Sequence, residues 1–249
     1  MIIEKYIAGN GESAAQKTLA SMIKDEKPGV SYADMLRYRV SGKVADRCND
    51  IYYIAHQDGK CLSRLWNGWG RHDNSIGNFG NFVTIEEVRG KGIGKKMLEV
   101  WFEDLQKQPN PPLGLFCTAN TRVAKLYLPY GFRPAILGQE YGSLYMPIGN
   151  SPENFHEFCD MYYTPTNKLI RRPADIEWRH EIDCLLKFAL IERGLSFGML
   201  GVTSMEEALL YSHENAEMLF TENGRCVGWI YKEQMQVYPT YENVEIISL

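Results

Sequence analysis

The chain has 249 residues, 45% hydrophobic and 23% charged, which is an ordinary balance for a globular protein. Its length predicts one large domain or two modest ones. The formal net charge of −4 gives no general attraction to nucleic acid. No apolar run approaches the roughly 20 residues that span a bilayer, and the N-terminus lacks the pattern of a signal peptide. We therefore expect no nucleic-acid or membrane partner, and a cytoplasmic location.

The six cysteines are scattered and include no C-x-x-C pair. This usage is typical of reduced thiols rather than of a disulfide framework or a zinc site. We therefore expect no metal cofactor. The cysteines are Cys48, Cys61, Cys117, Cys159, Cys184 and Cys226.

The first part of the chain predicts strands and helices in alternation, from apolar periodicity and turn residues. An Asp-Gly pair between two apolar runs predicts a tight hairpin. A run rich in Gly and Asn predicts a loop. In order, we expect a strand at 1–8, helices at 11–25 and 31–48, hairpin strands at 51–56 and 61–66, a loop at 67–80, a strand at 81–85 and a helix to about 107.

A buried strand is expected at 113–119, followed by a short helix over 120–131. Asn120 is a good N-cap for that helix and Gly131 suits its left-handed end. Pro129 predicts an irregular last turn. Two closing strands are expected at 132–136 and 142–146.

A Pro- and Gly-containing stretch at 147–152 predicts a linker, and hence domains at 1–148 and 153–249. The second unit contains an Asn-Gly hairpin that can be aligned with the Asp-Gly hairpin of the first. This leaves open a degenerate partial repeat, which would lack a second Gly-rich turn. The expected elements are helices at 154–163, 174–193 and from 203, hairpin strands at 216–221 and 226–232, and a strand at 244–247.

The most informative stretch is a Gly-rich turn, residues 89–96, between the strand at 81–85 and an amphipathic helix. Glycine leaves backbone amides uncovered, and the first amides of a helix have no internal partner. Such a turn favours an anion, above all phosphate. The alternating Gly90, Gly92 and Gly94 fit neither the G-x-G-x-x-G dinucleotide fingerprint nor the P-loop. The turn taken alone is equally compatible with a plain helix start surrounded by solvated lysines.

A second motif follows at 120–132, one helix and one strand further on. Together the two motifs resemble those of the GCN5-related N-acetyltransferase (GNAT) family, over residues 1–148. The first matches at Arg89, Gly92 and Gly94; the second matches at Asn120, Ala124, Leu126, Tyr127, Gly131 and Phe132. The resemblance implies an α/β (α+β) fold, with a mixed central sheet flanked by helices, to which a smaller C-terminal α+β unit is added.

The resemblance also implies acetyl-CoA as co-substrate and assigns roles to residues. The pyrophosphate would bind at Arg89, Gly90, Lys91, Gly92, Ile93, Gly94 and Lys95. The pantetheine arm would pair with Phe82, Val83 and Thr84. Asn120 would bind the coenzyme or bridge the splayed strands, and capping its helix is compatible with either role. Tyr127 would protonate the leaving thiolate, because a phenol with a pKa near 10 suits that role; the alternative is a half-buried helix tyrosine.

A general base is not evident, because Leu115 and the central strand supply no carboxylate where the family has one. Glu86 and Glu87 cap or screen the turn. His56, His72 and Asp73 are the remaining candidates, each also explained as a solvated residue, and a water chain would serve as well. Cys117, on a buried strand, favours direct attack in a ternary complex over an acetyl-cysteine intermediate.

The acceptor amine is a small molecule or a peptide, and the sequence does not choose between an amino sugar, a polyamine, an amino acid and a protein N-terminus. Aromatic residues that could shape its site are Tyr32, Met35, Tyr38, Trp66, Trp69, Tyr130 and Tyr141. The leading hypothesis is an N-acetyltransferase. The alternative is a non-catalytic CoA sensor or interaction protein on the same scaffold. An exposed edge strand would permit a homodimer.

Overall fold

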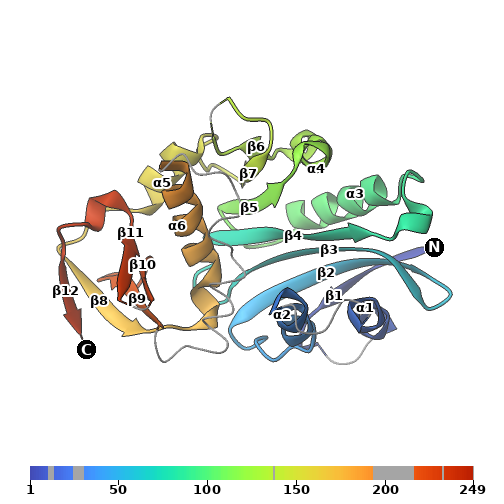
Figure 1. Ribbon diagram of the computed structural model, residues 1–249, viewed down its shortest axis with the longest axis horizontal. Helices are drawn as coiled ribbons and strands as arrows, with labels where there is room; N and C mark the ends of the chain where they lie inside the picture. The colour runs from blue at the N-terminus through green and yellow to red at the C-terminus, as the bar shows by residue number, and fades with distance from the viewer. Residues whose placement is uncertain (11–13, 25–30, 137, 193–215, 232, 249) are drawn as a thin grey trace.

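The structure is a computed structural model that describes residues 1–249 except 11–13, 25–30, 137, 193–215, 232 and 249. It contains two sheets (Figure 1). Seven strands form the first, in the order β1-β2-β3-β4-β5-β7-β6, and five form the second, in the order β11-β10-β9-β8-β12. The α/β fold class, with a mixed central sheet and a smaller C-terminal α+β unit, is confirmed.

The first sheet and its helices follow the order β-α-α-β-β-β-α-β-α-β-β, as the resemblance implies. Its strands are β1 (Ile2–Ile7), β2 (Cys48–Gln57), β3 (Lys60–Gly70), β4 (Ile76–Thr84), β5 (Gly114–Ala119), β6 (Arg133–Pro134) and β7 (Gly142–Pro147). Its helices are α1 (Ala14–Lys24), α2 (Ser31–Val40), α3 (Ile93–Gln106) and α4 (Thr121–Tyr127), with 3₁₀ turns at Glu86–Val88 and Leu128–Tyr130.

Helices cover both faces of this sheet (Figure 1). On one face, α3 and α4 bury a core that includes Met97, Trp101 and Phe132. On the other face, α1 and α2 bury a smaller core around Leu36 and Tyr52. Because alternate residues of a strand point to opposite faces, the same strands serve both cores.

The loop expected at 67–80 is wrong: most of this run is strand, since β3 extends to Gly70 and β4 begins at Ile76. Its glycines are needed for close packing. A Cβ at Gly68 would lie 2.7 Å from Asn49 O and 2.8 Å from the Trp66 ring, and one at Gly77 would lie 2.8 Å from Leu115. Glycine in a strand can mark such a close approach as well as a loop.

In its described residues, the C-terminal unit adds two α-helices and a second sheet. The expected elements that fall on described residues occur within five residues of their predicted bounds. Strands β8 and β11 were not expected, and the helix expected from 203 lies outside the described residues. The elements are α5 (Phe155–Tyr162), β8 (Lys168–Pro173), α6 (Arg179–Glu192), β9 (Ala216–Thr221), β10 (Cys226–Tyr231), β11 (Gln234–Val237) and β12 (Glu245–Ser248), with 3₁₀ turns at Ile176–Trp178 and Pro239–Tyr241.

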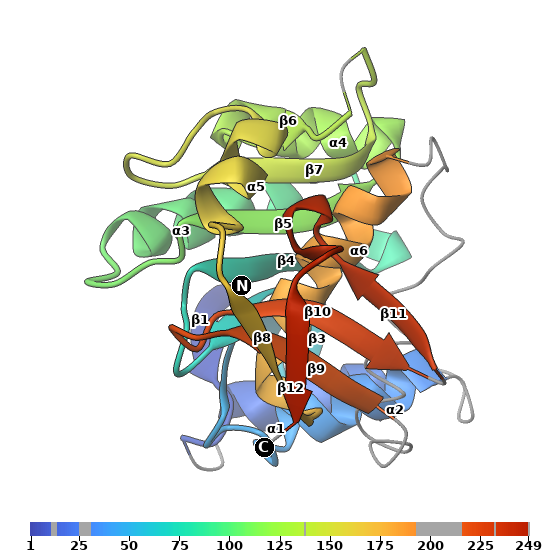
Figure 2. The ribbon, with the colours of Figure 1, turned by 90° about the vertical axis from the view of Figure 1, so that its left-hand side faces the viewer.

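Helix α6 lies between the two sheets (Figures 1 and 2). One continuous apolar cluster joins Phe116 and Tyr145 of the first sheet to Phe158 of α5 and Leu185 of α6. The two units are therefore packed together through a shared core. The domain division at 148–153 stays a prediction.

Among the described residues, none of the helices is long and apolar enough to cross a membrane. All six cysteines are free and buried. Within the same part of the chain, no group of three or more His, Cys, Asp or Glu side chains is arranged to hold a metal ion.

Candidate active site

The central feature of the first sheet is an opening between the parallel strands β4 and β5. They pair only at their beginnings, through Ile76–Gly114, Gly77–Leu115 and Asn78–Phe116. On its other edge, β4 pairs with β3 as far as Thr84. Within these described strands, the β4 edge from Phe79 onward therefore has no strand beside it. Ligands of open α/β sheets bind in such a crevice, beyond the carboxyl ends of the strands.

A bulge in β4 lies next to this opening. Between the pairs Trp66–Gly80 and Arg64–Val83, β3 advances two residues and β4 advances three. The extra residue of β4 is accommodated where Asn81 has a φ of 52°, in the left-handed region. A bulge bends and twists its strand and is common beside active sites. Here the pairing of β4 with β5 ends just before the bulge.

The Gly-rich turn after β4 leads directly into α3, and Gly92 is the N-cap of this helix. Gly92 has φ 78° and ψ 0°, and no side chain caps the helix. The first turn contains no acidic residue, and Lys91 and Lys95 beside it are exposed. An uncapped helix start combines free amides with the positive end of the helix dipole. This geometry suits a phosphate group.

Two further contacts fix the shape of the turn. The Arg89 side chain folds back, and its Nε donates to Thr84 O over 2.9 Å, which ties the turn to the end of β4. Gly94 lies against the Phe82 ring: a Cβ at position 94 would be 3.1 Å from the ring. A side chain at 94 would therefore push Phe82 out of place. Ile93 is buried below the turn and anchors it in the α3 core.

Phe82, Val83 and Thr84 are half-buried along the open edge of β4. On the β3 side, the Ser63 hydroxyl donates to Val83 O over 3.0 Å and lies 2.9 Å from Thr84 Oγ1. These contacts hold β4 on its β3 side, and its other edge faces the opening. An extended chain that carries amides can add to such an edge as a strand does.

Tyr127 lies at the end of α4, with a buried ring packed against Phe79, Phe82 and Phe132. Burial, with a smaller contribution from Cys117, raises the pKa of Tyr127 above its usual value. Its hydroxyl therefore keeps its proton at neutral pH, as a proton donor must. Its register, next to Phe82 of β4, places it beside the opening.

Asn120 caps α4, because its side-chain Oδ1 accepts from Val123 N over 3.0 Å. The amide nitrogen of the same side chain is on an exposed residue and makes no hydrogen bond among the described residues. The capping role that the sequence offered is therefore present, and the coenzyme-binding role stays a prediction.

The base candidates from the sequence do not meet at the opening. His56 lies 3.2 Å from Glu4, at the β2–β3 hairpin. The His72 ring contacts Glu177 over 2.5 Å, and Asp73 accepts from Ser75 N over 2.8 Å. All three residues lie in loops or at strand ends, and their side chains contact groups outside the opening.

Other candidates are likewise displaced from the opening. Glu87 forms an exposed ion pair with Lys60 over 3.5 Å, and Glu86 is exposed on the same turn. Trp66 and Trp69 are both buried, but in the cores of opposite faces of the sheet, so they do not line one acceptor site. The side chain of Tyr32 lies outside the described residues.

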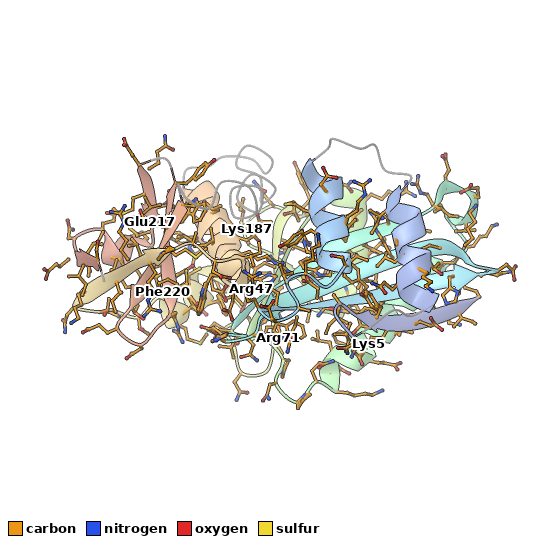
Figure 3. The ribbon with its side chains drawn as sticks, turned by 90° about the horizontal axis from the view of Figure 1, so that it is seen from below. Lys5, Arg47, Arg71, Lys187, Glu217 and Phe220 are labelled. Atoms are coloured by element: carbon orange, nitrogen blue, oxygen red, sulfur yellow. The ribbon has the colours of Figure 1, made fainter. Side chains whose placement is uncertain are left out.

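Sequence reasoning missed a cluster of buried polar groups that α6 brings to the opening. Asp183 of α6 accepts from Asn78 Nδ2 over 2.6 Å and from Lys187 Nζ. Asn78 belongs to the last β4–β5 pair before the strands separate. Figure 3 shows Lys187 on α6 where the two units meet. The one feature of β4 that could have indicated this cluster in advance is Asn78, a polar residue that is buried within the strand.

The cluster continues along α6 toward β2. His180 Nδ1 donates to Asn78 Oδ1 over 2.6 Å, and its Nε2 accepts from Arg179 Nε over 3.2 Å. Burial and the charge of Arg179 lower the pKa of His180 well below its usual value, so the ring is neutral. Arg179 also forms an ion pair of 2.5 Å with Asp50, which accepts from Trp66 Nε1 as well.

The comparisons with known proteins concern the first three-fifths of the chain. No family model matches the sequence, and no curated protein is found as a relative. Solved structures similar to it include ElaA of Escherichia coli, with 15% identity, a TM-score of 0.41 and coverage of 58% of this chain and 99% of that one.

An acyl-CoA N-acyltransferase from Pseudomonas aeruginosa has 13% identity and a TM-score of 0.42, with 59% of this chain and 99% of that one covered. GCN5 of Tetrahymena has 8% identity and a TM-score of 0.39, with 60% and 99% covered. These values describe a likeness, and the function has to be argued from the residues of this chain.

Proposed function

We propose that this protein is an acyltransferase that moves the acetyl group of acetyl-CoA to a primary amine, by direct attack in a ternary complex. One observation carries the proposal: the free edge of β4 leads, through Gly90 and Gly92, to the uncapped N-terminus of α3. A strand edge and a phosphate cradle in series match a ligand made of an amide-bearing arm and a pyrophosphate.

The residues fit that ligand in detail. Amides at the start of α3, from Gly92 to Lys95, would face the pyrophosphate, and the Lys91 side chain would add charge; the Lys91 amide itself donates to Val88 O over 3.4 Å. The positive φ of Gly90 and of Gly92, both 78°, opens the cradle in a conformation that other residues rarely adopt. The pantetheine amides would pair with Phe82–Thr84, and an amide of this bulged strand would polarise the thioester carbonyl.

In the reaction, the amine nitrogen forms a bond to the thioester carbon, and the carbon–sulfur bond breaks. Tyr127 gives its proton to the departing thiolate and recovers one from solvent. Cys117 does not carry the acetyl group, because burial raises the pKa of its thiol and the thiolate is the nucleophilic form.

Titration calorimetry with acetyl-CoA and with CoA tests the coenzyme site. We expect binding by the unaltered chain and a loss of at least about tenfold in affinity for Gly92→Asp, which adds strain at a positive φ and a negative charge where phosphate would bind. Gly149→Asp is the matched control, because Gly149 also has a positive φ, 63°, and open space around it but lies outside the site. The absence of heat with either ligand, or equal affinities for the two variants, would contradict the proposal.

Thiol release with a panel of amines then tests catalysis. Turnover with at least one amine class is expected, and the amines that react define the acceptor. The alternative, a CoA sensor without catalysis, predicts CoA binding with no turnover on any amine in the panel.

A further inference from the structure

Helix α6 of the C-terminal unit puts a carboxylate where the first unit has none. No acidic residue occurs on β4 between Ile76 and Thr84 or on β5 between Gly114 and Ala119. Asn78 belongs to the last β4–β5 pair, and its amide nitrogen donates to Asp183 Oδ2. The same nitrogen lies 3.4 Å from Phe116 O of β5. Asn78 thus connects Asp183 to both strands at the start of the opening.

Asp183 is held by two contacts through one oxygen, and its other oxygen has no hydrogen-bond partner among the described residues. Its Oδ2 accepts from Asn78 and from Lys187 Nζ, so a positive charge balances the carboxylate. Its Oδ1 is buried and has no hydrogen-bond partner among the described residues. The residue as a whole is 1% exposed. A buried carboxylate oxygen without a donor is costly to maintain, and an incoming ammonium would supply that donor.

The groups around Asp183 favour this direction of proton transfer. Lys187 Nζ donates to Asp183 Oδ2, and both ring nitrogens of His180 are engaged in hydrogen bonds, so neither side chain offers a free acceptor beside Oδ1. Burial raises the pKa of the Cys117 thiol on β5, with smaller influences of opposite sign from Lys187 and Asp183.

We propose that Asp183 is the general base of the acetyl transfer, supplied by the C-terminal unit and oriented by Asn78 and Lys187; this inference rests on the proposed function. The acceptor ammonium gives a proton to Asp183 Oδ1 and attacks the thioester as a neutral amine. The amide forms as the carbon–sulfur bond breaks. The second proton lost by nitrogen goes to solvent, and Tyr127 protonates the sulfur. The C-terminal unit is thus part of the active site.

The test compares Asp183→Asn with Asp50→Asn. Both carboxylates are 1% exposed, both accept from a cation of α6, and each has one buried oxygen without a hydrogen-bond partner among the described residues, so both substitutions alter one partner of a buried ion pair. Asp50 lies on β2, away from the opening. Rates are measured at pH 7 with two acceptors: an alkylamine, which is almost entirely protonated, and a hydrazide or alkoxyamine of similar size, which is almost entirely neutral.

We expect Asp183→Asn to lower kcat for the alkylamine by about 10²–10⁴-fold and to leave the rate with the neutral acceptor within about tenfold of the unaltered chain. The alkylamine rate of this variant should rise about tenfold per pH unit, as the free amine becomes available. Asp50→Asn should change both acceptors by the same factor, and neither substitution should change the affinity for CoA. Equal losses with both acceptors in Asp183→Asn would overturn the inference, because they would indicate a purely structural role.

Asp183→Asn leaves the Lys187 ammonium without its partner and could prevent folding. In that case the double variant Asp183→Asn/Lys187→Met, which removes the remaining charge, is measured in the same way and with the same two outcomes. The two proposals fail separately. An unaltered chain that binds no CoA and acetylates no amine overturns the proposed function. An active chain in which Asp183→Asn behaves like Asp50→Asn overturns only the role of Asp183.

Discussion

The two sides of the opening between β4 and β5 are built from different chemistry. The α3 side consists of backbone amides, glycines and exposed lysines, and its key groups face solvent. The α6 side consists of buried ionic and amide side chains, among them Asp183, Lys187 and Arg179, each at most 3% exposed. The first side is shaped by one continuous stretch of chain, and the second by residues about a hundred positions apart.

Because of this difference, we expect the two sides to respond differently to substitutions. A backbone site depends on which residues allow a conformation, so most substitutions of exposed side chains have small effects there. A buried network depends on every partner, because removal of one member leaves the other desolvated and unpaired. The predictions below test this contrast, from the largest expected effect to the smallest.

The largest effect is expected at Arg179, which holds Asp50 and His180 in the interior. Arg179→Met leaves the Asp50 carboxylate buried without its cation and should lower the free energy of unfolding by about 3–5 kcal/mol. Urea unfolding measures this change. The control is Arg133→Met, which removes a surface pair with Glu153 whose side chains are 47% and 74% exposed. That change should be about 0–1 kcal/mol, and equal effects would mean that α6 is not held by its buried charges.

The next effect is expected at Tyr127. Tyr127→Phe keeps the buried ring and removes the proton donor, so kcat should fall by about 10²-fold or more, with an unchanged affinity for CoA. Tyr130→Phe is the control: Tyr130 lies in the 3₁₀ turn directly after α4, and its hydroxyl donates to Lys95 O over 3.4 Å. An unchanged kcat in Tyr127→Phe would remove the proton-donor role and favour a sensor.

The contrast also explains how much the sequence could predict. The turn at Gly90–Gly94, the cap at Asn120 and the irregular end of α4 at Pro129 are local features. Each depends on local φ and ψ angles and on neighbouring residues, so the amino-acid sequence alone was enough to predict where it lies. The fold of residues 1–148 could be predicted from two such motifs, separated by one helix and one strand.

The α6 contribution could not be predicted in that way. Asp183 and Asn78 are 105 residues apart, and each has an ordinary sequence context: an acid on an amphipathic helix and a polar residue in a Gly-rich run. That same run was expected to be a loop because it is rich in Gly and Asn, whereas its glycines serve close packing within β3 and β4. A buried network of this kind is defined only when the two units pack together.

The smallest effect is expected from the lysines around the turn. Lys91 and Lys96 are exposed, so water and dissolved ions would screen the attraction of each lysine to the coenzyme phosphates. Lys91→Gln and Lys96→Gln should each weaken CoA binding by only about two- to fivefold at low ionic strength, and less at 0.5 M salt, where exposed charges are screened. Lys107→Gln, at the opposite end of α3, is the control and should have no effect. A larger, salt-independent loss in Lys91→Gln would mean that the coenzyme is held by side chains as well as by backbone, and the two sides of the opening would then differ less than proposed.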